Sequence, residues 1–262
     1  MEKETNLKKI KPKGWLSGFN NLMRAEFARW KTSMWWITGI IWVAIINGIL
    51  ASTLFSLEEG VVETALTLHS LFSGMFTTVA IVMFVQNAIV GEKKSGTAEW
   101  ILSMPVSRNA FIFSKLVGYF VSGGITMIIV PGIISYFEIA LISGVWLSFP
   151  RFLGMIGILL IHQLFYLTMT LMLGAFSDNL LPVIGIPLAF LFIQNYPAQL
   201  LPPLTHIFPW FLIIPEPNSE LAIGAAIAMG KPFFSVGPII VTAVGSIIFT
   251  VLAFWRFNRE EL

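Results

Sequence analysis

Long runs without charge alternate with short polar segments along this chain, and the runs set the expected architecture. Five of them contain no Asp, Glu, Lys or Arg, and each reaches the roughly 20 residues that a helix needs to cross about 30 Å of hydrocarbon. A sixth uncharged run, 179–215, is interrupted by prolines after residue 201, so only its first part can span. The pattern predicts an all-helical integral membrane protein with six transmembrane helices, at about 34–57, 66–91, 110–142, 152–177, 180–200 and 235–256.

Composition supports this class of protein and narrows its chemistry. Apolar residues make up 56% of the chain and charged residues 11%, and the mean hydropathy of +0.82 excludes a soluble domain. The absence of cysteine excludes disulfides, thiolate metal sites and cysteine nucleophiles. The polar start, 1–14, has no apolar core followed by a cleavage site. We therefore expect no removed signal peptide and treat 1–262 as a single transmembrane domain.

Basic residues predict the orientation of the chain. Fourteen of the 16 Lys and Arg residues fall in 1–33, in 92–115 and in the C-terminal tail. Cytoplasmic loops retain Lys and Arg, so we expect a multi-pass protein of the plasma membrane with both termini in the cytoplasm. Glu58 and the other acidic residues of its loop, together with Arg151 and Lys231, then lie on the outer side.

Two segments outside the spans also predict helices. Residues 16–32 place apolar side chains at helical spacing, which is typical of an amphipathic helix in the inner interface. The outer loop, 201–234, is rich in proline and cannot be one helix. Within it, Asn218 or Ser219 can cap a re-entrant or interfacial helix that Gly230 ends, with Trp210 and Phe211 as candidate interfacial anchors.

A charged segment, 92–115, separates the second run from the third and holds a coupling loop, 92–109. Gly96 permits a turn, Ser95 or Thr97 can cap a helix of two turns, and Pro105 must end it. Trp100, Ile101 and Met104 then form a small apolar surface. Two interpretations follow from the residues alone: a docking surface for a protein partner, or an interfacial helix whose tryptophan enters lipid.

The residues that follow this helix lead into the third span. Ser107 offers an N-cap, and Arg108 and Lys115 are expected to flank the entry of the third span at the cytoplasmic headgroups.

The same segment resembles the type-2 ABC transporter permeases, because it follows their E-x-x-x-G-T, L-x-x-P-V-S-R and K pattern. The matching residues are Glu92, Gly96, Thr97, Leu102, Pro105, Val106, Ser107, Arg108 and Lys115. Trp100 and Ala98 depart from the aliphatic residues that are more usual in that family. The resemblance implies a coupling helix that docks in a cleft of an ATP-hydrolysing subunit, with the candidate docking residues Glu92, Ser95, Gly96, Thr97, Glu99, Trp100, Ile101, Met104, Pro105 and Arg108.

An ATP site within the chain is not expected. Residues 91–97, GEKKSGT, place Thr97 where a phosphate-binding loop needs lysine, and they follow an apolar run rather than a strand. We predict no cofactor in this chain and no enzymatic activity. The resemblance implies that a separate ABC ATPase, in two copies, binds ATP and Mg²⁺, and that a second permease half, identical or related, completes the transporter in the bilayer. No nucleic-acid partner is expected.

Polar residues inside the spans are candidates for a translocation pathway, because burying them in lipid is costly. Asn47, His162 and Gln163 lie near the middle of their spans, and Glu138 lies near the outer interface. Hydrogen bonds between helices, or headgroup solvation for Glu138, are the favoured explanations of these residues. The very short inner turn holds Asp178, which is expected to cap the fifth span.

The sequence therefore predicts the membrane subunit of an ATP-driven transporter, and the resemblance favours export. An ion-coupled carrier or channel that uses Glu138 is one alternative. A membrane anchor or immunity factor that moves nothing is another. An intramembrane enzyme is disfavoured, because its candidate groups His162, Asp178 and His206 fall at three different depths.

Overall fold

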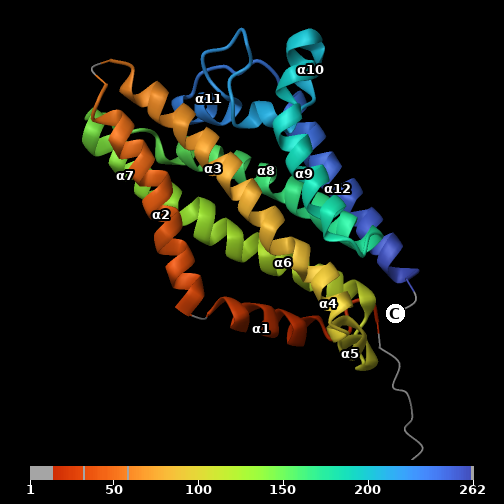
Figure 1. Ribbon diagram of the computed structural model, residues 1–262. Coiled ribbons are helices and arrows are strands. Elements are labelled where there is room, and N and C mark those ends of the chain that lie inside the picture. The colour runs from red at the N-terminus through yellow and green to blue at the C-terminus, as the bar shows by residue number, and fades with distance from the viewer. Residues whose placement is uncertain (1–13, 32, 58, 261–262) are drawn as a thin grey trace, which may run out of the picture.

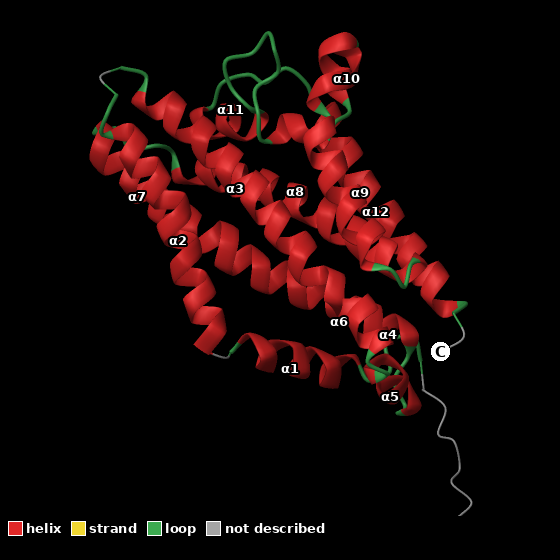
Figure 2. Cartoon of the chain, viewed as in Figure 1, coloured by secondary structure: helices red, strands yellow, loops and turns green. Residues whose placement is uncertain are grey.

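The computed structural model describes residues 14–31, 33–57 and 59–260, and within these residues every regular element is a helix (Figures 1 and 2). The lysine-rich start, 1–13, which was used to predict the orientation, and Glu58, which was predicted to lie on the outer side, are outside the described residues. The helices are α1 (Phe19–Trp30), α2 (Ser33–Leu54), α3 (Val61–Gln86), α4 (Glu92–Lys94), α5 (Thr97–Ser103), α6 (Arg108–Gly123), α7 (Val130–Ser143), α8 (Phe149–Phe176), α9 (Leu180–Ile193), α10 (Asn195–Leu200), α11 (Ile223–Met229) and α12 (Gly237–Asn258), with π-helical η1 (Asn87–Gly91) and η2 (Gly124–Ile129) and 3₁₀-helical η3 (Pro202–His206) and η4 (Pro209–Leu212).

Within the described residues, six helical stretches are long and apolar enough to cross a membrane, which confirms the predicted number. They are Trp36–Leu54, Val61–Lys94, Arg108–Ser143, Phe149–Phe176, Leu180–Leu200 and Gly237–Asn258. The second and third are longer than predicted, at 34 and 36 residues. Each exceeds about 30 Å of hydrocarbon at roughly 1.5 Å per residue. The second span was predicted to end at residue 91, before the charged residues, but the helix continues to Lys94.

A π-helical segment within the third span accommodates a proline. Pro131 has no backbone N–H, so it cannot satisfy the carbonyl of Met127 one turn earlier. The hydroxyl of Thr77 on α3 donates to this carbonyl at 3.4 Å, and η2 ends just before the proline. In a membrane a freed carbonyl needs such a partner. The π-helical turn and the Thr77 hydroxyl therefore allow the span to contain a proline without leaving the Met127 carbonyl unpaired.

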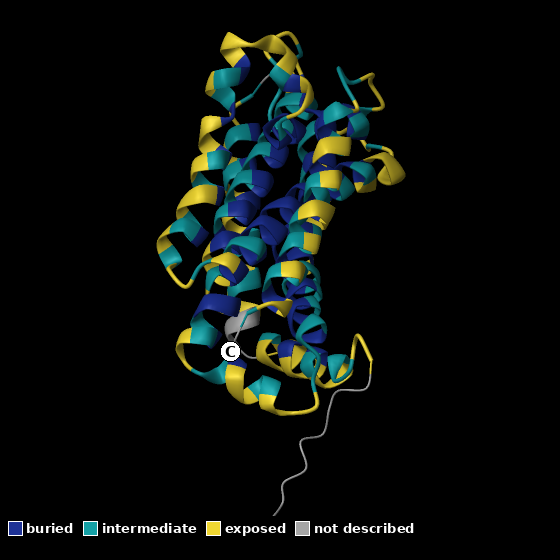
Figure 3. Ribbon diagram, turned by 90° about the vertical axis from the view of Figure 1, so that its right-hand side faces the viewer, coloured by how far each residue is buried: buried dark blue, intermediate teal, exposed yellow. Residues whose placement is uncertain are grey.

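The core lies around α8. Of the most apolar window of α8, 67% is buried, whereas only 22% is buried in α2, α9 and α12. Figure 3 shows the buried residues gathered on the inward sides of the helices and the exposed ones facing outward. The exposed outward residues of α2 and α12 are mostly apolar, including Ile40 and Ile247, so these faces suit lipid or a membrane-embedded partner.

The proline-rich loop packs on the bundle at the end of the molecule opposite α5, beside α11 (Figure 1). Trp210 and Phe211 are buried in the main hydrophobic cluster, so their prediction as interfacial anchors was wrong. The prolines break the loop into η3 and η4, and η4, which carries both aromatic residues, packs against α8, α11 and α12. Most residues of α11 are buried within the protein.

The boundaries of α11 were only partly predicted. Gly230 ends the helix with φ 68°, as predicted, and glycine adopts this left-handed conformation without a steric penalty. The start was wrong, because neither Asn218 nor Ser219 caps it. Ala222 occupies the N-cap position and no side chain caps the helix there. Asn218 instead binds Glu216 within the loop.

The close contact between the start of α12 and the proline-rich loop can be tested by substitution. A Cβ atom on Gly237 would lie 2.1 Å from the backbone carbonyl oxygen of His206, whereas one on Gly185 of α9 would meet nothing within 4 Å. We expect Gly237→Ala to lower the free energy of unfolding by about 1–3 kcal/mol, since overpacking against backbone forces a shift. Gly185→Ala is the matched control and should be near neutral. Thermal unfolding in detergent checks both, and equal stability of the two variants would contradict the described contact.

Candidate partner-docking site at the α5 end

The segment between the second and third spans forms the short helix that was predicted. α5 begins after Gly96, which has φ 70°, and Met104 is extended just before Pro105. Glycine is favoured at this left-handed turn because it lacks Cβ, and proline cannot continue a helix. The predicted cap was wrong: neither Ser95 nor Thr97 caps the helix, and their hydroxyls hydrogen-bond each other at 2.8 Å.

The exposed surface of α5 is smaller than predicted. Trp100 is 64% exposed and Met104 is also exposed, whereas Ile101 and Leu102 pack against a second hydrophobic cluster around Phe111. Consecutive residues on a helix point about 100° apart, so Ile101 cannot share the outward direction of Trp100. We call Trp100 and Met104 the α5 surface. Glu99 is exposed next to it.

Hydrogen bonds fasten the exit of this loop to the residues before α1. The Ser17 hydroxyl donates to the carbonyl of Pro105 at 2.9 Å, and the Ser107 amide donates to the carbonyl of Ser17 at 3.0 Å. The Ser107 hydroxyl donates to the carbonyl of Trp15 at 2.5 Å and accepts from the Ala110 amide at 3.1 Å. The last contact confirms Ser107 as the N-cap of α6. The loop is therefore held at a fixed position.

A buried ion cluster lies beneath the loop and joins α1, α4 and α6. The Lys115 ammonium lies 2.6 Å from Glu26 Oε1 and 2.5 Å from Glu92 Oε1, and Arg29 lies 3.0 Å from Glu92 Oε1. Only 2% of the Lys115 side chain is exposed. The prediction that Lys115 flanks the headgroups was therefore wrong, because the carboxylates draw it inward. Glu92, a candidate docking residue, is buried here and not on the α5 surface.

The cluster balances two cations against two carboxylates. Burial disfavours the charged form of Arg29, but the hydrogen bond that Arg29 donates to Glu92 and the nearby charges of Glu26 and Glu92 outweigh this effect, so the pKa of Arg29 is raised. Sequence reasoning missed Glu26. A signal was present, because Glu26 lies four residues after Leu22 and three after Met23, on the apolar side of an amphipathic helix.

Arg108 binds the end of the last span rather than solvent or headgroups. Its guanidinium donates to the carbonyls of Phe257 at 3.2 Å and Asn258 at 3.1 Å, and also to that of Glu260. A cation at the C-terminal end of a helix satisfies carbonyls that lack intrahelical partners and complements the helix dipole. The start of α6 is thus joined to the end of α12.

A further ion pair involves the short turn between α8 and α9. Lys93 Nζ lies 3.1 Å from Asp178 Oδ1 and 2.6 Å from Glu260 Oε1. The predicted capping role of Asp178 was wrong. Asn179 is the N-cap of α9, and its side chain accepts from the Leu181 amide at 3.1 Å.

A recess of about 630 Å³ opens beside α5. It is formed by the start of the described chain, the coupling loop and the end of α12. Its lining mixes charged, amide, hydroxyl and apolar side chains, which suits a protein surface better than hydrocarbon. The lining residues are Gly14, Trp15, Glu99, Leu102, Ser103, Val106, Ser107, Arg108, Asn109 and Asn258.

Two of the candidate pathway residues make hydrogen bonds between helices. Asn47 accepts from the Ser135 hydroxyl at 2.6 Å, and His162 Nδ1 lies 3.2 Å from the Thr78 hydroxyl. These contacts join α2 to α7 and α8 to α3. They are what the simpler interpretation of these residues predicted.

Gln163 and Glu138, the other two candidates, have side-chain atoms without a hydrogen-bond partner among the described residues, as does Nε2 of His162. Gln163 is buried, and neither polar atom of its side chain has a hydrogen-bond partner among the described residues. The same holds for Oε2 of Glu138, which is half-buried on α7. Unpartnered polar groups are costly in hydrocarbon. These two residues therefore remain candidates for contact with water or cargo.

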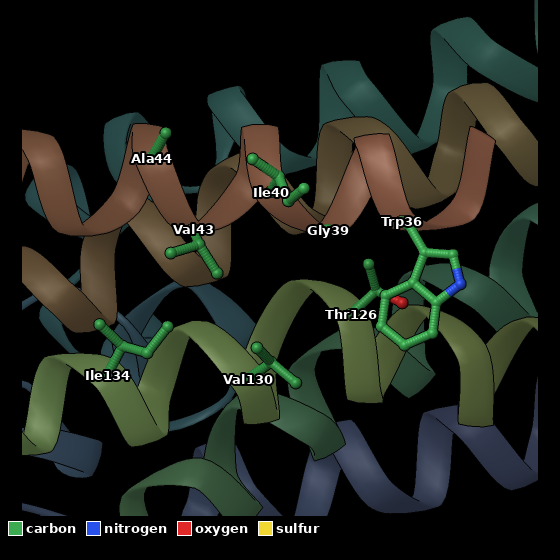
Figure 4. Close-up of a pocket in the computed structure, with 8 residues that line it drawn as sticks. All are labelled: Trp36, Gly39, Ile40, Val43, Ala44, Thr126, Val130 and Ile134. Carbon is green, nitrogen blue, oxygen red and sulfur yellow. The ribbon is translucent and has the colours of Figure 1, made fainter. Parts of the chain in front are cut away.

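An apolar recess of about 410 Å³ lies between α2 and the third span (Figure 4). Of its lining side chains only Thr126 and Trp36 carry a polar atom, so it suits hydrocarbon rather than a polar ligand. The lining residues are Trp36, Gly39, Ile40, Val43, Ala44, Thr126, Val130 and Ile134.

The fold and this site define a multi-pass, all-helical membrane protein. A family model described as ABC-2 family transporter protein matches residues 44–262, and the chain therefore belongs to that family. The match confirms the resemblance seen in residues 92–115 and supports a transport permease role. Among curated proteins, none matches this chain.

The buried ion cluster generates a prediction. Lys115→Met leaves Glu26 and Glu92 facing each other with half-exposed Arg29 as the remaining cation. We expect a loss of about 3–5 kcal/mol in the free energy of unfolding, because removal of one partner leaves buried charge uncompensated. Thermal unfolding in detergent measures it. Lys94→Met, at an exposed position two residues from Glu92, is the control.

A second comparison separates charge from volume. Glu26→Gln and Glu92→Gln, combined with Lys115→Met, remove the uncompensated charges and should recover most of the lost stability. A triple variant no more stable than Lys115→Met would contradict an electrostatic cause.

Proposed function

We propose that this chain is the transmembrane subunit of an ATP-driven exporter of the plasma membrane, with both termini in the cytoplasm. A separate ABC ATPase, in two copies, binds ATP and Mg²⁺ and docks on the α5 surface and the adjoining recess. A second permease half, identical or related, completes the translocation route. The chain itself performs no hydrolysis.

The observation that carries this proposal is the exposure of Trp100 on a helix that is otherwise anchored firmly. Large apolar side chains exposed in a polar loop are typical of protein contacts, and tryptophan is enriched among residues that dominate binding energy. Ile101 and Leu102 hold α5 against the bundle. A force applied to Trp100 and Met104 therefore acts on the spans rather than on a mobile loop.

The lengths of the second and third spans favour a protein partner over lipid for this surface. Their 34 and 36 residues exceed the hydrocarbon thickness, and α4 and the start of α6 lie at the α5 end of these long helices (Figure 1). α5 then projects from the membrane on the side that carries most of the Lys and Arg residues. This distribution supports a cytoplasmic location.

The proposed second permease half follows from the poorly buried faces of α2, α9 and α12. Binding of ATP would close the two ATPase subunits and displace α5 in each half, and the spans would rearrange between inward and outward access. The family membership supports an ABC ATPase as partner in general. Export is the direction that the type-2 permease resemblance favours.

An ion-coupled carrier is the second candidate, and the unpartnered carboxylate oxygen of half-buried Glu138 favours it. Under that function Glu138→Gln abolishes transport and ATP is not required. Under the proposed function flux depends on ATP. A pure membrane anchor gives no flux in either condition.

The α5 surface is tested by Trp100→Ala combined with Met104→Ala. We expect roughly 10-fold or greater weakening of binding to the ATPase, because truncated interface hot spots commonly cost about 2 kcal/mol or more. Affinity of the purified ATPase for the permease in nanodiscs, and ATP-dependent flux in proteoliposomes, measure the effect.

Trp146→Ala is the matched control, since Trp146 is 63% exposed at the opposite end of the bundle. It should leave ATPase binding unchanged. Unaltered affinity and unaltered coupled flux in the double variant would show that the partner does not dock on the α5 surface.

A further inference from the structure

The three residues of α4 form the end of the second span, just before α5, and two of them make ion pairs in different directions. Glu92 and Lys93 are consecutive, so their side chains leave the helix about 100° apart. Their partners come from different parts of the bundle. This helix of three residues therefore makes ion pairs with several distant segments of the chain.

Glu92 connects α4 to α1 and to the third span. Its Oε1 lies 2.5 Å from Lys115 of α6 and 3.0 Å from Arg29 of α1. α1 ends at Trp30, and α2 begins at Ser33. Lys115 also binds Glu26, so α1 and α6 move as one unit with α4 while the pairs persist.

Lys93 connects α4 to the fourth, fifth and sixth spans. Asp178 belongs to the turn that joins α8 to α9, and Glu260 follows the end of α12. The Lys93 side chain is itself mostly buried. Asp178 is 76% exposed, whereas Glu260 is mostly buried, so Glu260 is the stronger of the two connections because exposed pairs are screened.

We propose that α4 is an ionic hub that carries a displacement of α5 to α1 and to the α5-side ends of the third, fourth, fifth and sixth spans. Glu92 acts on α1 and the third span, and Lys93 acts on the fourth, fifth and sixth spans. The source of the displacement rests on the proposed function, but the hub itself does not. Glu92 and Lys93 are therefore positioning residues for coupling and not part of the docking surface.

Short, dry ion pairs are suited to this role. Water is largely excluded from Glu26, Glu92 and Lys115, so their attraction is weakly screened and separation leaves a charge without a partner. Neighbouring elements then keep their contacts when one of them is moved. The two connections are also independent, because Glu92 and Lys93 share no partner in the described ion pairs.

The hub can be tested without any ATPase, because the chain has no cysteine and introduced cysteines take spin labels uniquely. One labelled pair joins Ala28 of α1 to Glu99 of α5, and a second joins Leu181 of α9 to Glu99. All three positions are exposed. Distance distributions are measured by pulsed electron paramagnetic resonance in nanodiscs.

Each variant should affect one pair only. Glu92→Gln should broaden the distribution between α1 and α5 and leave the α9 pair unchanged, and Lys93→Gln should do the reverse. Lys94→Gln, an exposed neighbour with no ion pair in the described structure, is the control and should change neither. Loosening of the whole fold would broaden both pairs, and that result, or no broadening at all, would overturn the hub.

Milder variants guard against misfolding. Arg29→Gln and Glu260→Gln remove one partner from each connection and should give the same selectivity with smaller broadening. With the ATPase and ATP present, both hub variants should retain ATPase binding but lose roughly 2- to 30-fold in transport per ATP hydrolysed, the range typical of coupling residues. Unchanged transport per ATP would contradict the hub's role. Failure of ATPase binding in the parent chain would instead refute the proposed function.

Discussion

The ammonium group of Lys115 is buried, and it can remain so only while carboxylates face it. Glu26 and Glu92 supply them from α1 and α4 at 2.6 and 2.5 Å. Uncompensated burial of charge is costly enough to determine local structure. This requirement fixes α1 against α6 and turns Glu92 inward. It also sets the direction in which the chain leaves α4, and so the position of α5 and its exposed tryptophan. The remaining arrangement at this end of the molecule depends on that cluster.

The same requirement for partners operates within the spans. Pro131 frees the carbonyl of Met127, and the Thr77 hydroxyl satisfies it. Asn47 and His162 find partners on neighbouring helices. Gln163 does not, and neither does one oxygen of Glu138. In a family of transporters, polar groups that stay unpartnered in the interior are candidates for contact with water or cargo.

The sequence predicted features that depend on local chemistry. Six spans follow from runs of uncharged residues, and α5 follows from Gly96 and Pro105. Features that depend on distant contacts were missed: Lys115 pairs with Glu26, 89 residues away, and Trp210 is buried because the proline-rich loop folds back. Ends of helices were also misplaced where a charge was read as a boundary. Glu92 continues the second span because its charge is neutralised by tertiary partners that no local pattern reveals.

The proposed function requires a separate ATPase to bind this chain at the α5 surface. The most direct measurement places a photo-crosslinking amino acid at position 100 or at position 146 and illuminates the permease in nanodiscs with a purified candidate ATPase from a neighbouring reading frame. Trp100 and Trp146 are about equally exposed, so proximity decides the outcome. If the ATPase docks on the α5 surface, position 100 will crosslink to the ATPase and position 146 will not. Crosslinks from position 100 to lipid alone would contradict this docking site.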